Sequence, residues 1–197
     1  MAILEHFAST GFDESRSFAK VKDAIAEAGD RITLAYAARE LENSEYVHWA
    51  FQWRSMRARD ASLLDGNYQR IMQAAGTVSE RGPIVMSLKD SQYDLLASIL
   101  QTRVPEFAVT QVKGPASRED ARRAVEGMVA NPQDRTTQGE LVLSAIDDED
   151  CVVFVCGWNS VDDHIFELSK EAHVAMNELA MANMDARYVS HCATRMI

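Results

Sequence analysis

The strongest constraint on the fold is the order in which short apolar runs and amphipathic segments follow one another, because the same order occurs twice along the 197 residues. Four runs in the first half have the length and the β-branched or aromatic content of strands: residues 3–10, 31–38, 46–53 and 84–88. Apolar residues at helical spacing lie between them, at residues 13–29 and 64–75. The predicted order is β-α-β-β-α-β, that of a ferredoxin-like unit.

The second half repeats this order. Strands are predicted at residues 106–113, 140–146, 151–158 and 186–196, and helices at residues 117–129 and 161–184. At an offset of 105 residues, Trp53 of the first half meets Trp158 of the second. We therefore expect two tandem ferredoxin-like repeats, at residues 1–97 and 104–197, joined by a partly helical segment at 90–105.

A sheet with helices on one face only leaves its other face uncovered. Packing two such sheets face to face buries both apolar faces and closes a barrel-like core, here as a pseudo-dimer within one chain of the α+β class. The alternative is two independent ferredoxin-like domains side by side, which would leave one apolar face of each sheet in water. A further homodimer of the whole chain stays open.

The charge balance excludes several classes of partner. The 20 basic and 30 acidic residues give a net charge of −10, with no cluster of Lys and Arg, so neither nucleic acid nor an anionic membrane surface is expected as a partner. Three cysteines in a chain of this length do not suggest a disulfide framework. The chain has no apolar run of about 18 residues and no signal-peptide pattern at its start. These features predict a soluble, cytoplasmic protein.

Residues 157–164, with the sequence GWNSVDDH, resemble the segment that joins the third strand to the second helix in dimeric α+β barrel proteins. These include the antibiotic-biosynthesis-monooxygenase, EthD-like and stress-responsive groups. The resemblance implies a mostly apolar pocket between each sheet and its helices. In the first half, Arg59 stands where His164 would be, and Gln52 where Gly157 would be, so the second half is the better candidate for a functional pocket.

His164 is the candidate base of this pocket. It falls in the first turn of the predicted helix, and a helix N-terminus disfavours the imidazolium form, although Asp162 and Asp163 oppose that effect. The alternative is an exposed first-turn histidine bonded to a neighbouring carboxylate. Tyr188 and His191 on the last predicted strand are candidate hydrogen-bond donors.

Further residues are expected to contact a substrate, with Trp158 as a pocket wall. The set is Phe154, Trp158, Ile165 and Leu168 in the second half, and Trp53 and His48 in the first. His48 shares its strand face with a possible second polar spot that includes His6, and His173 is expected at the periphery.

Metal and cofactor motifs are missing from the sequence. There is no Cys-x-x-Cys or His-Glu-x-x-His, no glycine-rich phosphate loop and no Gly-x-Ser-x-Gly elbow. We therefore expect neither a metal nor a cofactor. Haem held by a single histidine stays open, because one axial ligand leaves no spacing signature.

Members of the resembled superfamily include cofactor-independent monooxygenases of aromatic polyketides, polyketide cyclases, muconolactone-type isomerases, haem-dependent enzymes and proteins of unknown role. An apolar pocket with a neutral imidazole suits proton abstraction from an activated carbon acid. The leading expectation is a cofactor-independent, monooxygenase-like enzyme acting on a hydrophobic aromatic or polyketide-type molecule. The alternatives are a cyclase or isomerase of the same fold, or a non-catalytic protein that binds a small ligand in a stress response.

Overall fold

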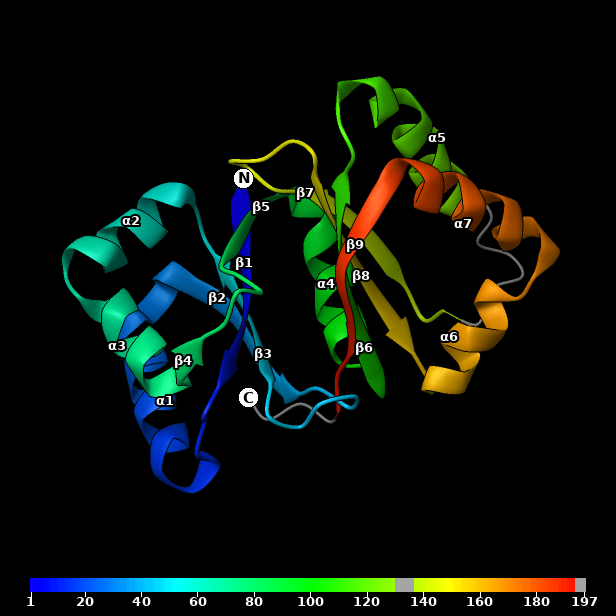
Figure 1. Ribbon diagram of the computed structural model, residues 1–197. Helices are drawn as coiled ribbons and strands as arrows, with labels where there is room; N and C mark the ends of the chain where they lie inside the picture. The colour runs from blue at the N-terminus through cyan, green and yellow to red at the C-terminus, as the bar shows by residue number, and fades with distance from the viewer. Residues whose placement is uncertain (130–136, 194–197) are drawn as a thin grey trace. The chain divides into compact units, whose positions relative to one another are not determined.

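The computed structural model describes residues 1–129 and 137–193, which divide into two compact units (Figure 1). The first unit is Met1–Tyr93, to which the described residues Cys192 and Ala193 also belong, and the second is Asp94–His191. Each unit has one antiparallel sheet with helices, so the predicted α+β class is confirmed. The face-to-face packing of the two sheets stays a prediction.

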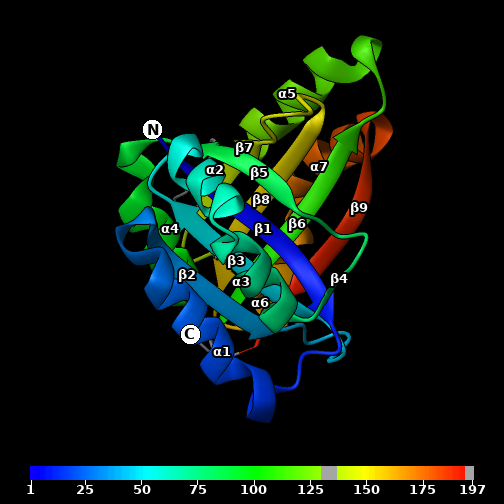
Figure 2. The same ribbon diagram turned by 90° about the vertical axis from the view of Figure 1, so that its left-hand side faces the viewer.

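The sheet of the first unit contains five strands: β1 (Ala2–Thr10), β2 (Ile32–Arg39), β3 (Val47–Trp53), β4 (Thr77–Val78) and β5 (Ile84–Leu88). The order is β2-β3-β1, and both β4 and β5 pair antiparallel with the remaining edge of β1. The helices are α1 (Glu14–Ala28), α2 (Met56–Leu64) and α3 (Asn67–Ala75). In Figure 2, α1 and α3 lie across one face of this sheet.

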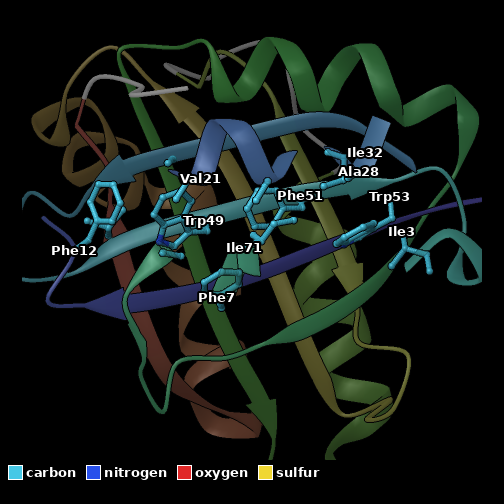
Figure 3. Close-up of a cluster of buried hydrophobic side chains, with 14 residues drawn as sticks. Ile3, Phe7, Phe12, Val21, Ala28, Ile32, Trp49, Phe51, Trp53 and Ile71 are labelled. Atoms are coloured by element: carbon cyan, nitrogen blue, oxygen red, sulfur yellow. The ribbon is translucent and has the colours of Figure 1, made fainter. Parts of the chain in front are cut away.

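A dense aromatic core fills the space between the sheet and helices α1 and α3 (Figure 3). The buried side chains labelled there are Ile3, Phe7, Phe12, Val21, Ala28, Ile32, Trp49, Phe51, Trp53 and Ile71. Trp49 is central to this core: its ring stacks on Phe7 at 6.3 Å between centroids, and Phe12 meets it edge-on at 5.1 Å. Large aromatic side chains thus occupy the helix-facing side of the first sheet.

The sheet of the second unit contains β6 (Val104–Val112), β7 (Glu140–Ser144), β8 (Cys151–Trp158) and β9 (Met184–His191), in the order β7-β8-β6-β9. Its helices are α4 (Tyr93–Leu100, which begins at the last residue of the first unit), α5 (Arg118–Val129), α6 (Val161–Leu168) and α7 (Glu171–Asn183). Short 3₁₀ turns occupy Gly29–Arg31, Asp90–Gln92 and Pro115–Ser117. The predicted β-α-β-β-α-β order is therefore present in both units, with α4 between them in sequence.

Two predicted helices are each divided in the structure. The helix expected at residues 64–75 breaks at Asp65 and Gly66, where Gly66 has φ 78°, a left-handed conformation that glycine adopts without strain. Leu64, expected on the buried stripe, is instead 90% exposed. The helix expected at 161–184 breaks at Ser169 and Lys170, because Lys170 takes an extended conformation (φ −67°, ψ 137°).

The last predicted strand is shorter than expected. β9 ends at His191, and the next residue, Cys192, forms a bridge with Glu40. The backbone N–H of Ala193 donates to the carbonyl of Arg39 at 2.7 Å. Residues 194–196 of the predicted strand lie outside the described residues. Among the helices that are described, none is both long and apolar enough to cross a membrane.

A buried histidine pair lies in the first unit. His6 on β1 and His48 on β3 are both fully buried, with 3.1 Å between His6 Nε2 and His48 Nδ1. Glu40 Oε2 lies 2.8 Å from His48 Nε2 and 2.5 Å from the Arg81 guanidinium. Burial, with a smaller contribution from His48, lowers the pKa of His6 well below its usual value. His6 is therefore held neutral.

Acidification should destabilise the protein through His6. An unfolded imidazole takes up its proton near pH 6.5, whereas native His6 does so only at lower pH, so the unfolded state binds more protons and stability falls as the pH drops below about 6.5. The slope for this one group is at most about 1.4 kcal/mol per pH unit. Urea unfolding at several pH values checks this, and H6Q should flatten the profile. Parallel profiles for the two proteins would contradict the assignment.

Candidate functional site

A cavity of about 420 Å³ lies in the second unit, between its sheet and helices α5, α6 and α7. The sheet contributes alternate residues of β6 and β8: Glu106, Ala108, Thr110, Phe154, Cys156 and Trp158. The helices contribute Met128, His164, Glu167, Leu168, His173, Asn177, Ala180 and Met181. Most of these side chains are apolar, and a pocket of this size and lining is typical of small-molecule sites.

Strand register shows why the second unit is hollow where the first is filled. Phe7 on β1 lies opposite Trp49 on β3, and the equivalent register in the second unit sets Ala108 opposite Phe154. A phenyl ring is thus replaced by a methyl group, and an indole by a phenyl ring.

The neighbouring register pair adds to this space. Glu5 lies opposite Phe51 in the first unit, and Glu106 lies opposite Cys156 in the second. A second aromatic ring is therefore replaced by a thiol. Because these positions face the helices in both units, the replacements leave unfilled volume beneath α6 and α7.

Glu106 is the polar centre of the cavity wall. Its side chain is almost fully buried, at 5% exposure, and it lies on β6 among apolar neighbours. A buried carboxyl group needs hydrogen-bond partners to offset the loss of hydration. The indole N–H of Trp158 donates to Glu106 Oε2 at 2.6 Å, so the tryptophan expected as a pocket wall also fixes this carboxylate.

The start of α6 brings His164 to the same place. The Ser160 hydroxyl caps the helix by accepting from the Asp163 N–H at 3.1 Å. One turn later the His164 ring stacks on Trp158, with 4.8 Å between centroids. The His164 side chain is only 13% exposed, so the exposed first-turn alternative does not describe it. The expectation of a neighbouring carboxylate is met by Glu106 rather than by an acidic residue of the helix.

His191 completes a cluster of three polar side chains. Its Nε2 lies 2.7 Å from His164 Nδ1 and 3.5 Å from Glu106 Oε2. His164 Nδ1 lies 3.2 Å from the same oxygen. The cluster can therefore hold and exchange protons between two imidazoles and a carboxylate at the edge of an apolar cavity.

A second polar pair, Glu167 and His173, lines the cavity further along the helices. His173 Nε2 lies 3.1 Å from Glu167 Oε1, and Lys170 Nζ donates to Glu167 Oε2 at 2.9 Å. On a continuous helix, side chains six residues apart would point about 120° away from each other. The break at Ser169 and Lys170 removes that constraint, so His173, expected at the periphery, lines the cavity.

The remaining predicted site residues are distributed as follows. Phe154 and Leu168 line the cavity with Trp158 and His164. Ile165 is 60% exposed and lies outside the lining. Tyr188 is paired with Val109, between two cavity-facing positions of β6, so it lies on the opposite face of the sheet. The structure therefore does not bring Ile165 or Tyr188 to the cavity.

Trp53 and His48 belong to the first unit and do not line this cavity. His48 is part of the buried histidine pair, and Trp53 belongs to the first unit's counterpart of the cluster. Its indole N–H donates to Glu5 at 2.9 Å, as Trp158 does to Glu106.

In the corresponding cluster of the first unit, the buried glutamate is Glu5, and its partners are an arginine and a tyrosine. Arg59 donates to both oxygens of Glu5, at 2.9 and 3.1 Å, and the Tyr68 hydroxyl donates to Oε1 at 2.8 Å. Burial lowers the pKa of Arg59, but the contacts with Glu5 outweigh it and the net shift is upward; burial and Glu5 both raise the pKa of Tyr68. Both groups therefore keep their protons, and this cluster has a structural role.

Sequence reasoning missed Glu106, the residue around which the cluster forms. A signal was present, because each first strand carries a single acidic residue among mostly apolar ones, Glu5 and Glu106. A search for metal-binding motifs could not find the cluster either, because its three members come from β6, α6 and β9 and have no fixed spacing in the sequence.

Filling the cavity provides a direct test of its existence. A108F restores the aromatic ring found at Phe7, so it should weaken binding of the hydrophobic dye Nile red at least about tenfold while costing less than the 1–3 kcal/mol typical of overpacking. Fluorescence titration and urea unfolding measure the two effects. A182F, the same change at an exposed position of α7 outside the lining, is the matched control. Unchanged dye binding in A108F, or a large loss of stability, would mean that the space is absent.

A scan against protein-family models and a search of curated protein sequences found no match. Solved structures do match. A proposed monooxygenase from Lactobacillus acidophilus NCFM has a TM-score of 0.63 at 11% identity, over 98% of this chain and 93% of its own. An anthrone oxidase-like protein has a TM-score of 0.61 at 12% identity, over 99% and 92%.

The structural matches also correct one expectation. A haem-binding protein from Thermus thermophilus matches 98% of this chain and 90% of its own, with a TM-score of 0.53 at 9% identity. The expectation of no cofactor, which rested on missing sequence motifs, is therefore wrong, because a protein with this fold binds haem. Since the matches span nearly the full length of both chains, they show that this chain shares the fold of these proteins, the dimeric α+β barrel fold that the resemblance implied.

Proposed function

We propose that the second unit contains the active site of an oxygenase-type enzyme, which removes a proton from a hydrophobic aromatic small molecule. The observation that carries this proposal is the Glu106–His164–His191 cluster at the wall of a largely apolar cavity. The monooxygenase and anthrone oxidase-like structural matches support the same reaction class. A polyketide-type substrate stays a prediction.

The substrate would place an acidic C–H or phenolic O–H next to His164. A cavity of about 420 Å³ is within the range of pockets that enclose molecules of a few fused rings. Phe154, Leu168 and Met181 supply apolar contacts, and Trp158 fixes the plane of the imidazole by stacking on it. The largely apolar lining lowers the local dielectric, which strengthens electrostatic interactions at the reacting atoms.

His164 is the proposed base. When it accepts a proton it becomes an imidazolium, and Glu106, 3.2 Å away, stabilises that charge. His191, at 2.7 Å from His164, offers a route by which the proton can leave. The substrate carbanion then reacts with dioxygen. For anthrone the balanced reaction is anthrone plus dioxygen to anthraquinone plus water: the methylene carbon is oxidised to a carbonyl and dioxygen is reduced.

Anthrone turnover tests the assignment. H164A should lower the catalysed rate by about 10² or more, because general-base catalysis contributes that much. E106Q, which keeps the shape but loses the charge that stabilises imidazolium, should lower it at least about tenfold. Oxygen uptake and anthraquinone absorbance measure the rates against the uncatalysed oxidation.

I165A, on the same helix with its side chain toward solvent, is the matched control and should keep the wild-type rate. A near-normal rate for H164A would contradict the base assignment. Tight anthrone binding without turnover in the wild type would favour the non-catalytic alternative, a ligand-binding barrel protein.

Haem is a second candidate ligand of this cavity, supported by the haem-binding structural match. Haem iron is commonly held by a histidine, and a ligating histidine usually bonds its other ring nitrogen to a carboxylate. His164 and His173 both line the cavity, and each lies beside a buried glutamate. We favour His173 as the residue that would hold the group, because His164 is already part of the three-membered cluster. Bound haem would supply iron for one-electron and dioxygen chemistry.

Haem titration separates the two histidines. A shifted Soret band on adding haem to the purified protein is expected, with H173A weakening the interaction at least about tenfold and H164A leaving it nearly unchanged. Difference absorption spectra provide the measurement, with free haem as the reference. If the wild type gives the spectrum of free haem, or if H173A has no effect, haem held by His173 is excluded.

A further inference from the structure

Three potential metal ligands converge at the cavity wall. Glu106, His164 and His191 are buried or mostly buried, and one donor atom of each lies within 3.5 Å of the other two. They come from β6, α6 and β9. In the sheet β6 pairs with β9 on one edge and with β8 on the other, and α6 directly follows β8 in the chain. Two imidazoles and one carboxylate are a donor set typical of divalent transition-metal sites.

Two edges of the triangle formed by these donor atoms match the separations between ligands of one ion, and the third, between the two nitrogens, is shorter. Its edges are 2.7 Å between the two nitrogens, 3.2 Å from Glu106 Oε2 to His164 Nδ1, and 3.5 Å from Glu106 Oε2 to His191 Nε2. Ligand atoms at about 2.1 Å from an ion lie about 3.0 Å apart at a right angle and about 3.4 Å apart at the tetrahedral angle. A point about 2.1 Å from all three atoms therefore exists, about 1 Å out of their plane.

The surroundings of the triangle also suit a cation. Trp158 donates to the same Glu106 oxygen and so restrains the carboxylate, as outer partners of metal ligands do. Among the described residues lining the cavity there is no lysine or arginine, and Glu140 adds negative charge, whereas Lys170 balances the charge of Glu167. A triad of this kind leaves coordination positions open to the cavity.

We infer that Glu106, His164 and His191 form a site for one divalent transition-metal ion with open coordination positions for a small-molecule oxygen ligand. This goes beyond the proposed function, in which the same three groups share protons. Protons and the ion compete for the same atoms, because an imidazole nitrogen ligates only when it carries no proton. The metal-bound and proton-transferring forms of the cluster therefore exclude each other.

Cobalt(II) is the probe, because its visible absorption reports coordination by nitrogen and oxygen. Titration of the purified full chain with Co(II), without substrate, should show one bound equivalent with ligand-field bands, and binding should weaken between about pH 7.5 and about pH 5.5. H191A and E106Q should each weaken binding at least about tenfold. Zinc(II) should displace cobalt, as measured by loss of the bands.

H173A is the matched control: this histidine lines the same cavity and is also paired with a glutamate, but it is not part of the triad. It should bind Co(II) as the wild type does. Circular dichroism confirms folding of each variant, and if H191A does not fold, H164A gives the same readout from helix α6. No Co(II) binding by the wild type, equal binding by the triad variants, or loss of binding in H173A would each overturn the inference. Because no substrate is present, its failure leaves the anthrone result unaffected, and the reverse also holds.

Discussion

Each unit is organised around one glutamate buried in its first strand and bonded to the tryptophan that ends its third strand. A carboxyl group in this position is costly to bury unless other groups satisfy it, so the residues that reach it determine what each unit can do. In the first unit the partners are Arg59 and Tyr68, which hold their protons firmly. In the second they are His164 and His191, two imidazoles whose ring nitrogens can donate or accept a hydrogen bond.

The same division appears in the packing. The first unit fills its helix-facing side with Phe7, Trp49 and Phe51, whereas the second has smaller side chains at the register-equivalent positions. Two imidazoles beside the glutamate and an open cavity thus occur together in the second unit, whereas the first combines an arginine–tyrosine cluster with dense packing. A buried glutamate, the tryptophan bonded to it and a serine-capped helix recur in both units, and their origin as two copies of one module stays a prediction.

Periodicity in the sequence was sufficient to predict the order of strands and helices, because apolar spacing reports which face of each element is buried. The local resemblance in residues 157–164 was sufficient to place Trp158 and His164 at one pocket. The helix break at Lys170 could not be predicted, since neither glycine nor proline marks it. The resemblance also predicted an apolar pocket in the second half. Glu106 was missed for another reason: its place in the cluster depends on which side chains lie opposite each other across the strands, and that register becomes known only once the sheet is assembled.

The short interruption between α6 and α7 places the cavity's two histidines on separately supported helices. His164 is held from the start of α6 by the Ser160 cap and by Trp158, whereas His173 begins a new helix whose direction is set by Lys170. Substitutions along α7 can therefore change the lining of the cavity without moving Glu106, His164 or His191. A unit divided in this way can alter the shape of its cavity over evolutionary time while the cluster at the wall keeps its geometry.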